Sequence, residues 1–206
     1  MTGQTHIAAG VAGAMVLAVT LHDPVTPALV ILAGLGGLAP DLDHPDALLT
    51  RHVIGMRHVT GAAQSLHVWR HRGLTHSVVA LAVTTILLLP LLDLILAHLT
   101  LALGVGIGHA AWTYALWHAW GADGVLGWAA GYASHMIVDA LNTKGVQWFW
   151  PWRVWIKSPI PNITVGTWPE LIFRWGMLLG VIWWNPVLGL ITAVSSEGLY
   201  RLIKVT

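Results

Sequence analysis

Long stretches without a charged side chain dominate this sequence and limit what it can fold into. The uncharged runs cover residues 1–22, 24–40, 73–92, 94–122, 124–138 and 175–196. Several of them approach or exceed the roughly 20 residues that an α-helix needs to cross a bilayer. Charged side chains make up 9% of the chain, whereas a soluble globular protein carries about 25%. The pattern excludes an ordinary water-soluble globule and predicts a polytopic helical membrane protein.

The charge balance and the lack of cysteine exclude several classes of function. The formal net charge is +1, and the scattered basic residues form no stripe that could neutralise phosphates. Direct nucleic-acid binding is therefore not expected. The sequence contains no cysteine, which removes disulfides, thiolate nucleophiles and cysteine-based zinc sites. Any metal ion must be held by His, Asp or Glu.

The apolar runs predict an all-α membrane bundle of about five or six helices, in a single domain over residues 1–206. The expected spans cover residues 2–21, 25–39, 74–97, 99–117, 121–141 and 168–194. The first run lacks the basic start of a signal peptide, so we expect it to be retained. Residues 45–72 predict a polar loop with a short interfacial helix near 62–69. The tryptophans of residues 143–168 are typical of an aromatic belt at a membrane interface.

The basic residues predict the orientation of the bundle. The polar loop contains four arginines, namely Arg51, Arg57, Arg70 and Arg72. The turn at residues 22–24 contains no Lys or Arg, so we expect the polar loop and the polar helix ends on the cytoplasmic side of the inner membrane. Three full crossings at 74–97, 99–117 and 121–141 would place the end of the third at the opposite face. We therefore expect either a re-entrant segment, with 99–117 as the candidate, or a site sunk towards the middle of the membrane.

Four short motifs contain nearly all the potential metal ligands. They are Thr5-His6, Pro40-Asp41-Leu42-Asp43-His44, His71-Arg72-Gly73-Leu74-Thr75-His76-Ser77 and Ser134-His135-Met136-Ile137-Val138-Asp139. His135 and Asp139 are spaced i and i+4, so that an imidazole and a carboxylate lie on one face of a helix. Asp41 and Asp43 follow the end of an apolar helix, where an irregular backbone can direct both towards a cation.

A divalent cation explains why such groups stand beside apolar helices. An unpaired ionised side chain near a bilayer costs several kcal/mol, and a cation bound by carboxylates and imidazole lone pairs removes much of that cost. These ligands suit Zn²⁺ first, with Mn²⁺, Fe²⁺ or Ni²⁺ as alternatives. The four motifs offer more ligands than one tetrahedral ion uses, so two or three ions are expected.

In this order, the motifs resemble those of a bacterial and archaeal family of inner-membrane metal-dependent hydrolases, one member of which is described as LexA-binding. The resemblance spans nearly the whole chain, and His-Arg-Gly-x-Thr-His-Ser is its most specific part. It implies a His/Asp metal centre and a distant relationship to the zinc-dependent phospholipase C and nuclease superfamily. Carried over residue by residue, the metal positions are His6, Asp41, Asp43, His44, His71, His76, His135 and Asp139. The segment Gly166–Glu170 resembles a late Gly-x-x-x-Glu element of the family.

From these residues we expect a membrane-embedded hydrolase that acts on a phosphate ester of a lipid or lipid-like molecule. The expected roles are bridging or charge balance for Asp41, Asp43 and Asp139, terminal ligation for His6, His76 and His135, and ligation or orientation of a ligand for His71 or His44. Arg72 would neutralise substrate charge. Asp43, His71 and Arg72 are the expected catalytic residues. The alternatives are a metal carrier and a non-catalytic scaffold with a structural metal.

Each motif also has a simpler interpretation. His6 alone is compatible with an interfacial histidine, and the acidic run is compatible with a solvated turn. His135 and Asp139 could form a hydrogen-bonded pair inside one helix. Ser77 is expected to cap a helix rather than to act as a nucleophile. The sequence assigns no role to Glu170 or to four isolated ionisable residues, namely Asp93, His98, His109 and His118. It predicts no oligomeric state.

Overall fold

Helices account for nearly all the regular structure of the protein. The computed structural model describes residues 1–52, 55, 58, 60–62, 72–102, 109–159, 163–186 and 193. Its helices are α1 (Gly3–Leu21), α2 (Pro27–Leu38), the 3₁₀ helix η1 (Ala39–Asp43), α3 (Leu48–His52), the 3₁₀ helix η2 (Leu74–His76), α5 (Val78–Ala102), α6 (His109–Ala140) and α7 (Trp168–Trp184). Within these ranges no strand is present, and the prediction of an all-α fold is confirmed.

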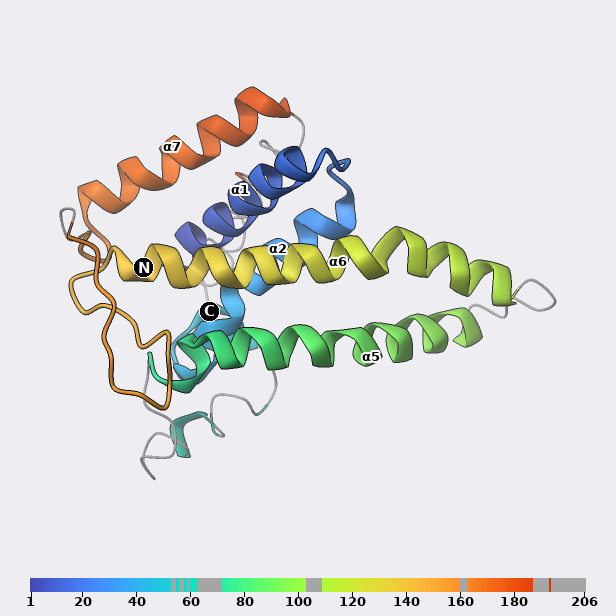
Figure 1. Cartoon of the computed structure of the whole chain (residues 1–206), viewed down its shortest axis with the longest axis horizontal. Helices are drawn as coiled ribbons and strands as arrows, with labels where there is room; N and C mark the ends of the chain where they lie inside the picture. The colour runs from blue at the N-terminus through green and yellow to red at the C-terminus, as the bar shows by residue number, and fades with distance from the viewer. Residues whose placement is uncertain are drawn as a thin grey trace.

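The first two helices form the hairpin that the sequence predicts. α1 ends at His22, which adopts a left-handed conformation. Thr26 caps α2 by accepting a hydrogen bond from the Leu29 amide at 3.3 Å, and Pro27 at the first helical position has no N–H to leave unpaired. α2 tightens into η1 around Pro40. The acidic run therefore lies at the same end of the hairpin as the start of α1 (Figure 1).

α5 and α6 form a second hairpin, which corrects the expected topology. The prediction of separate segments at 99–117 and 121–141 is wrong, because α6 is one continuous helix from His109 to Ala140. Gly121 does not end it, since a glycine inside a helix costs only about 1 kcal/mol. α5 and α6 lie side by side and extend past the other helices (Figure 1). The start of α5 and the end of α6 therefore lie together, and no re-entrant segment is required.

Glycines allow α2 to approach α6 until the two backbones touch. A Cβ atom on Gly131 would lie 2.0 Å from the carbonyl oxygen of Ala33, and one on Gly127 would lie 2.2 Å from that of Leu29. Cβ atoms in real proteins essentially never come closer than 3.0 Å to such an atom. Small residues at helix interfaces are typical of membrane bundles. The contact places η1 directly beside the last turns of α6.

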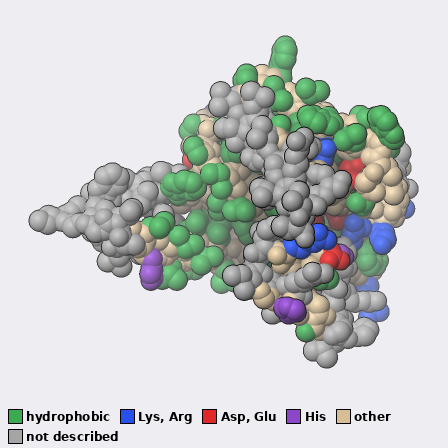
Figure 2. Space-filling view, turned by 180° about the vertical axis from the view of Figure 1, so that it is seen from behind, with side chains coloured by type: hydrophobic (Ala, Val, Ile, Leu, Met, Phe, Trp, Pro, Cys, Tyr) green, Lys and Arg blue, Asp and Glu red, His purple; other side chains and the backbone are tan. Residues whose placement is uncertain are grey.

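Large apolar side chains cover the outer helices. Ile86 on α5 is 64% exposed and Trp183 on α7 is 89% exposed. α1 (Gly3–Leu21) and the Val78–Ile95 part of α5 are long and apolar enough to cross a membrane. In Figure 2, hydrophobic side chains cover much of the surface, while charged ones gather towards one end. α7 ends at Trp184, earlier than predicted, because Pro186 favours an extended conformation at Asn185.

The loop between α6 and α7 exposes tryptophans near the start of α5. Val146 and Ile156 exchange two backbone hydrogen bonds of 3.0 and 2.9 Å, and the Val78 amide donates to the Trp148 carbonyl at 2.9 Å. Between these anchors, Trp152 is 70% exposed. An aromatic belt at a membrane interface needs tryptophans exposed in this way, and the belt itself stays a prediction. Most of the expected interfacial helix near 62–69 lies outside the described residues.

The glycine contact yields a prediction with a matched control. Gly131→Ala should lower the free energy of unfolding by about 1–3 kcal/mol, because the new Cβ must displace the backbone of α2. Gly176→Ala on α7 meets no atom within 4 Å, so it should be neutral or stabilise by up to about 1 kcal/mol. Thermal unfolding in detergent micelles, followed by circular dichroism, measures both. Equal unfolding temperatures of the two variants would contradict the close contact.

Candidate metal centre

Side chains from all four sequence motifs converge at one end of the bundle. His6 comes from α1, Asp41 from η1, His76 from η2, and His135 and Asp139 from the end of α6. All are buried except Asp41, whose side chain is 18% exposed. They form two overlapping groups, His6–Asp41–His135 and His76–His135–Asp139, in each of which the possible ligand atoms lie within 4.8 Å of one another.

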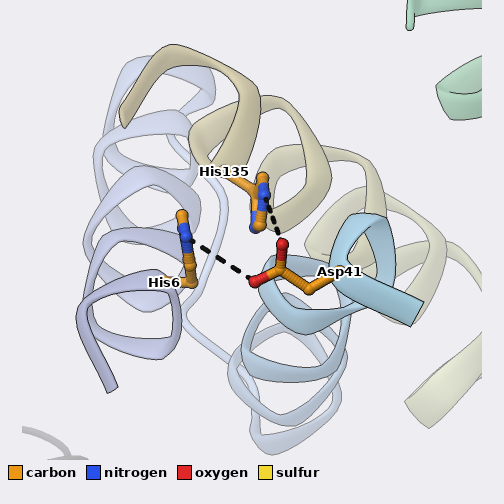
Figure 3. Close-up of side chains that lie close together, drawn as sticks. All are labelled: His6, Asp41 and His135. Carbon is orange, nitrogen blue, oxygen red and sulfur yellow. Dashed lines mark ion pairs between the residues drawn. The ribbon is translucent and has the colours of Figure 1, made fainter. Parts of the chain in front are cut away.

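Asp41 lies between the imidazoles of the first group. Figure 3 shows His6 and His135 pointing towards its carboxylate from two different helices. The distance to Asp41 is 3.9 Å from His6 Nε2, 3.7 Å from His135 Nε2 and 3.6 Å from His76 Nε2. Burial raises the pKa of Asp41, but the neighbouring imidazoles outweigh this effect and hold that pKa well below its usual range. The carboxylate is therefore ionised and available to a cation.

The hydrogen bonds of His135 and His76 determine which of their nitrogens carry lone pairs. His135 Nδ1 lies 2.7 Å from the carbonyl oxygen of Gly37; a carbonyl only accepts, so Nδ1 carries a proton, and in the neutral ring Nε2 carries the lone pair. The hydroxyl of Thr75 donates to Asp43 at 2.5 Å and lies 3.0 Å from His76 Nδ1. The hydroxyl then accepts from that nitrogen, so that in the neutral ring the lone pair of His76 is on Nε2.

The two Nε2 atoms lie 3.1 Å apart, and when both rings are neutral their lone pairs face each other. Such lone pairs repel unless a positive charge lies between them or beside them. His6 strengthens the argument: its ring stacks on that of His135 with centroids 3.6 Å apart. Both of its nitrogens are buried; Nδ1 has no hydrogen-bond partner among the described residues, and Nε2 lies 3.4 Å from Asp139 Oδ1. Three imidazoles and two carboxylates thus have the composition and the unused lone pairs that a divalent cation requires.

Asp43 and Arg72 lie around these groups rather than inside them. Asp43 Oδ2 is 3.7 Å from His76 Nδ1, the nitrogen that faces away from Asp41. It also accepts from the Arg72 amide at 3.3 Å. A carboxylate behind a metal-binding histidine is a common way to orient its ring. Arg72 Nη2 lies 3.1 Å from Asp139 Oδ2, and the Met1 ammonium contacts Asp139 Oδ1 at 2.6 Å.

Of the remaining predicted residues, those whose side chains are described stand apart from the two groups. His44 is half-buried, and its Nδ1 accepts from the Asp46 amide at 3.2 Å. His71 lies outside the described residues. Asp93 and His98 are exposed on α5, where His98 contacts the Leu94 carbonyl. His109 and His118 lie on α6, and their side chains are not among those described.

Glu170 is a supporting residue whose role the sequence left unassigned. Its Oε1 accepts from the Thr2 amide at 2.5 Å, the Thr2 hydroxyl at 2.9 Å and the Thr5 hydroxyl at 2.7 Å. Its Oε2 accepts from the Gly166 amide at 2.6 Å. The carboxylate thus ties the start of α7 to the first turn of α1, immediately before His6.

The repeated Thr-His pair was a signal for these supporting contacts. Thr5 precedes His6 and Thr75 precedes His76, and each hydroxyl donates to a carboxylate, that of Glu170 or Asp43. The Gly37 carbonyl and the Tyr132 hydroxyl, which donates to the Thr75 carbonyl, left no comparable signal. Their partners lie in segments far away in the sequence.

Replacing Glu170 should therefore loosen both the fold and the centre. Glu170→Ala leaves four donors without their acceptor, so we expect the free energy of unfolding to fall by about 2–3 kcal/mol and His6 to be held less firmly. Asp23→Ala, an exposed carboxylate in the α1–α2 turn, should change it by less than about 0.5 kcal/mol. Thermal unfolding of both variants decides the matter, and matching curves would refute the clamp.

The comparisons with known proteins agree with the membrane character of the chain. The family described as YdjM inner membrane protein matches residues 1–204. No curated protein and no solved structure shows significant similarity to the chain. The family description names no hydrolase activity and no relationship to phospholipase C, so these stay predictions. Because the match covers almost all of the sequence, the chain belongs to the YdjM inner membrane protein family.

Proposed function

We propose that the protein is a membrane-embedded metal-dependent hydrolase. The observation that carries the proposal is the pair of Nε2 atoms of His76 and His135, 3.1 Å apart and beside the carboxylates of Asp41 and Asp139, where neutral rings direct both lone pairs at one place. A bound cation removes the repulsion of the lone pairs and neutralises the carboxylates. Zn²⁺ suits this ligand set, with Mn²⁺, Fe²⁺ and Ni²⁺ as alternatives.

The overlapping groups support a centre with more than one ion. His135 belongs to both groups, while His6 contributes to one and His76 to the other. The family resemblance adds His44 and His71 as candidate ligands or supporting residues. Divalent ions held there would supply an activated water and polarise the scissile bond. Asp43 would orient His76 through its Nδ1 side, and Arg72 would neutralise negative charge on the substrate.

Access to the centre favours an enzyme over the alternatives. Asp41 and Arg72 line a cavity of about 640 Å³, so a substrate can reach the side of the centre. A structural metal would need ligands closed on every side. A carrier would need ligands near the middle of the membrane, whereas this cluster lies at the ends of α1 and α6.

The position of the cluster also supports a phosphate ester of a lipid or lipid-like molecule as substrate. The exposed tryptophans of the α6–α7 loop lie at the same end of the bundle, where headgroups meet water. The arginines of the polar loop at 45–72 support a cytoplasmic position for this end.

Metal content tests the proposal directly. The purified protein should retain at least one divalent transition metal per chain after dialysis against a weak chelator. His76→Ala and Asp139→Ala should remove most of it, because each deletes a side chain of a ligand group. Since imidazole binds metal only when deprotonated, retained metal should decrease as the pH falls below about 6. Elemental analysis of each sample gives the measurement.

His58→Ala is the matched control, because this histidine is exposed and belongs to neither group. It should retain the metal of the parent protein. A folded parent protein without metal would refute the proposal. Equal loss of metal in all three variants would show that the two groups do not identify the metal ligands.

The proposed orientation has its own test, because single introduced cysteines are the only thiols in this chain. Asp46→Cys and Arg153→Cys replace exposed residues at the metal end and should react with a membrane-impermeant reagent only from the cytoplasmic side. Asp23→Cys in the α1–α2 turn should react only from the opposite side. Labelling of Asp46→Cys and Arg153→Cys from different sides would contradict a common end for the two loops.

A further inference from the structure

The cavity beside the candidate metal centre, which we name the entrance pocket, is lined by both charged and apolar side chains. Its volume is about 640 Å³, and its polar lining includes Asp41, Arg72 and Lys144. Its apolar lining includes Leu38 and Leu48. A pocket with a few charged groups beside apolar walls fits an amphiphilic ligand better than a small soluble one.

Arg72 has hydrogen-bond donors to spare in this pocket. The residue is 7% exposed, and among the described residues only the Nη2 of its guanidinium contacts a carboxylate, that of Asp139. Its Nε and Nη1 are buried and lack a hydrogen-bond partner in the described part of the chain. A buried donor without a partner costs about 1–3 kcal/mol. The planar guanidinium matches two oxygens of a phosphate group.

Lys144 supplies a second positive charge to the same pocket. Its side chain is exposed, and no carboxylate of the described residues lies within ion-pair distance of it. Arg51 also lines the pocket, but it is paired with Asp46 at 3.7 Å. Of the cations in the lining, Arg72 and Lys144 are therefore the ones with capacity for a bound anion.

We infer that the entrance pocket binds the phosphate group of an anionic amphiphile, with Arg72 holding phosphate oxygens beside the metal centre and Lys144 selecting anionic over zwitterionic headgroups. The inference rests on the proposed function in one respect, because the metal centre of that proposal is where the bond of the ligand would react. The binding itself uses only side chains of this chain. Lys144 is then a specificity-determining residue, and Leu38 and Leu48 accommodate the apolar part of the ligand.

Equilibrium binding to the detergent-solubilised full chain tests this inference. The probes are short-chain phosphatidic acid, phosphatidylcholine with the same acyl chains, and inorganic phosphate, each with Zn²⁺ and with a chelator. The parent protein should bind phosphatidic acid more tightly than phosphatidylcholine. Lys144→Gln should weaken phosphatidic acid binding about fivefold and leave phosphatidylcholine unchanged, as expected for one partly exposed charge contact. Arg72→Gln should weaken both lipids by about tenfold or more.

Lys157→Gln is the control, since this lysine is exposed on the α6–α7 loop and does not line the entrance pocket. Equal affinities of the parent protein for the two lipids, or equal behaviour of Lys144→Gln and Lys157→Gln, would overturn the inference. Circular dichroism verifies that Arg72→Gln is folded, and Lys144→Gln alters only an exposed side chain.

The probes also distinguish a lipid phosphate from a soluble phosphate, and they test the pocket separately from the metal centre. Competition by inorganic phosphate as strong as that by phosphatidic acid would assign the site to a soluble phosphate and refute the role of the apolar wall. Phosphatidic acid binding by a protein that retains no metal would support the pocket and refute the metal centre. Retained metal without phosphatidic acid binding would support the metal centre and refute the pocket.

Discussion

The backbone contact between α2 and α6 decides where the metal-site residues lie. Gly127 and Gly131 bring α6 against the carbonyl groups of Leu29 and Ala33. Because α2 ends shortly afterwards, η1 lies beside the last turns of α6, and the Gly37 carbonyl reaches His135. The contact that packs the two helices thus also sets the tautomer of a candidate ligand. A side chain larger than hydrogen at either glycine would push α2 and α6 apart. It would thereby also move the residues of η1 away from His135 and Asp139.

The candidate metal centre is a set of lone pairs and negative charges that the fold holds in a buried place. Water cannot solvate His6, His76 and His135 there. The outer hydrogen bonds of His76 and His135 leave one nitrogen of each ring directed at the cluster. In a low-dielectric interior, such groups are stable only with positive charge nearby. Asp41 and Asp139 make a divalent cation a better partner than a proton. Arg72 contacts Asp139 and lines the entrance pocket, so it would join the proposed metal binding to the proposed recognition of an anion.

Several parts of this arrangement were predictable from local sequence patterns. The spacing of His135 and Asp139 placed them on one helix face, and the motif after Pro40 placed two carboxylates at a helix end. The division of α6 into two segments failed because hydropathy does not distinguish a glycine that ends a helix from one that packs against a neighbour. The supporting roles of Gly37 and Glu170 depend on partners far away in the sequence. The Gly37 carbonyl lies 2.7 Å from His135 Nδ1, and Glu170 accepts a hydrogen bond from the Thr2 amide at 2.5 Å.

The sequence by itself determined a helical membrane protein with His and Asp gathered in four motifs, because hydropathy and helical spacing are local properties of the chain. Only the tertiary structure decided which of these groups face one another. Asp41 and Asp43 stand two residues apart in one 3₁₀ helix, and no local pattern separates them. The packing of η1 against η2 and α6 turns Asp41 towards Nε2 of His76 and His135 and places Asp43 behind His76 at Nδ1, because one turn of tight helix cannot direct both carboxylates to the same side.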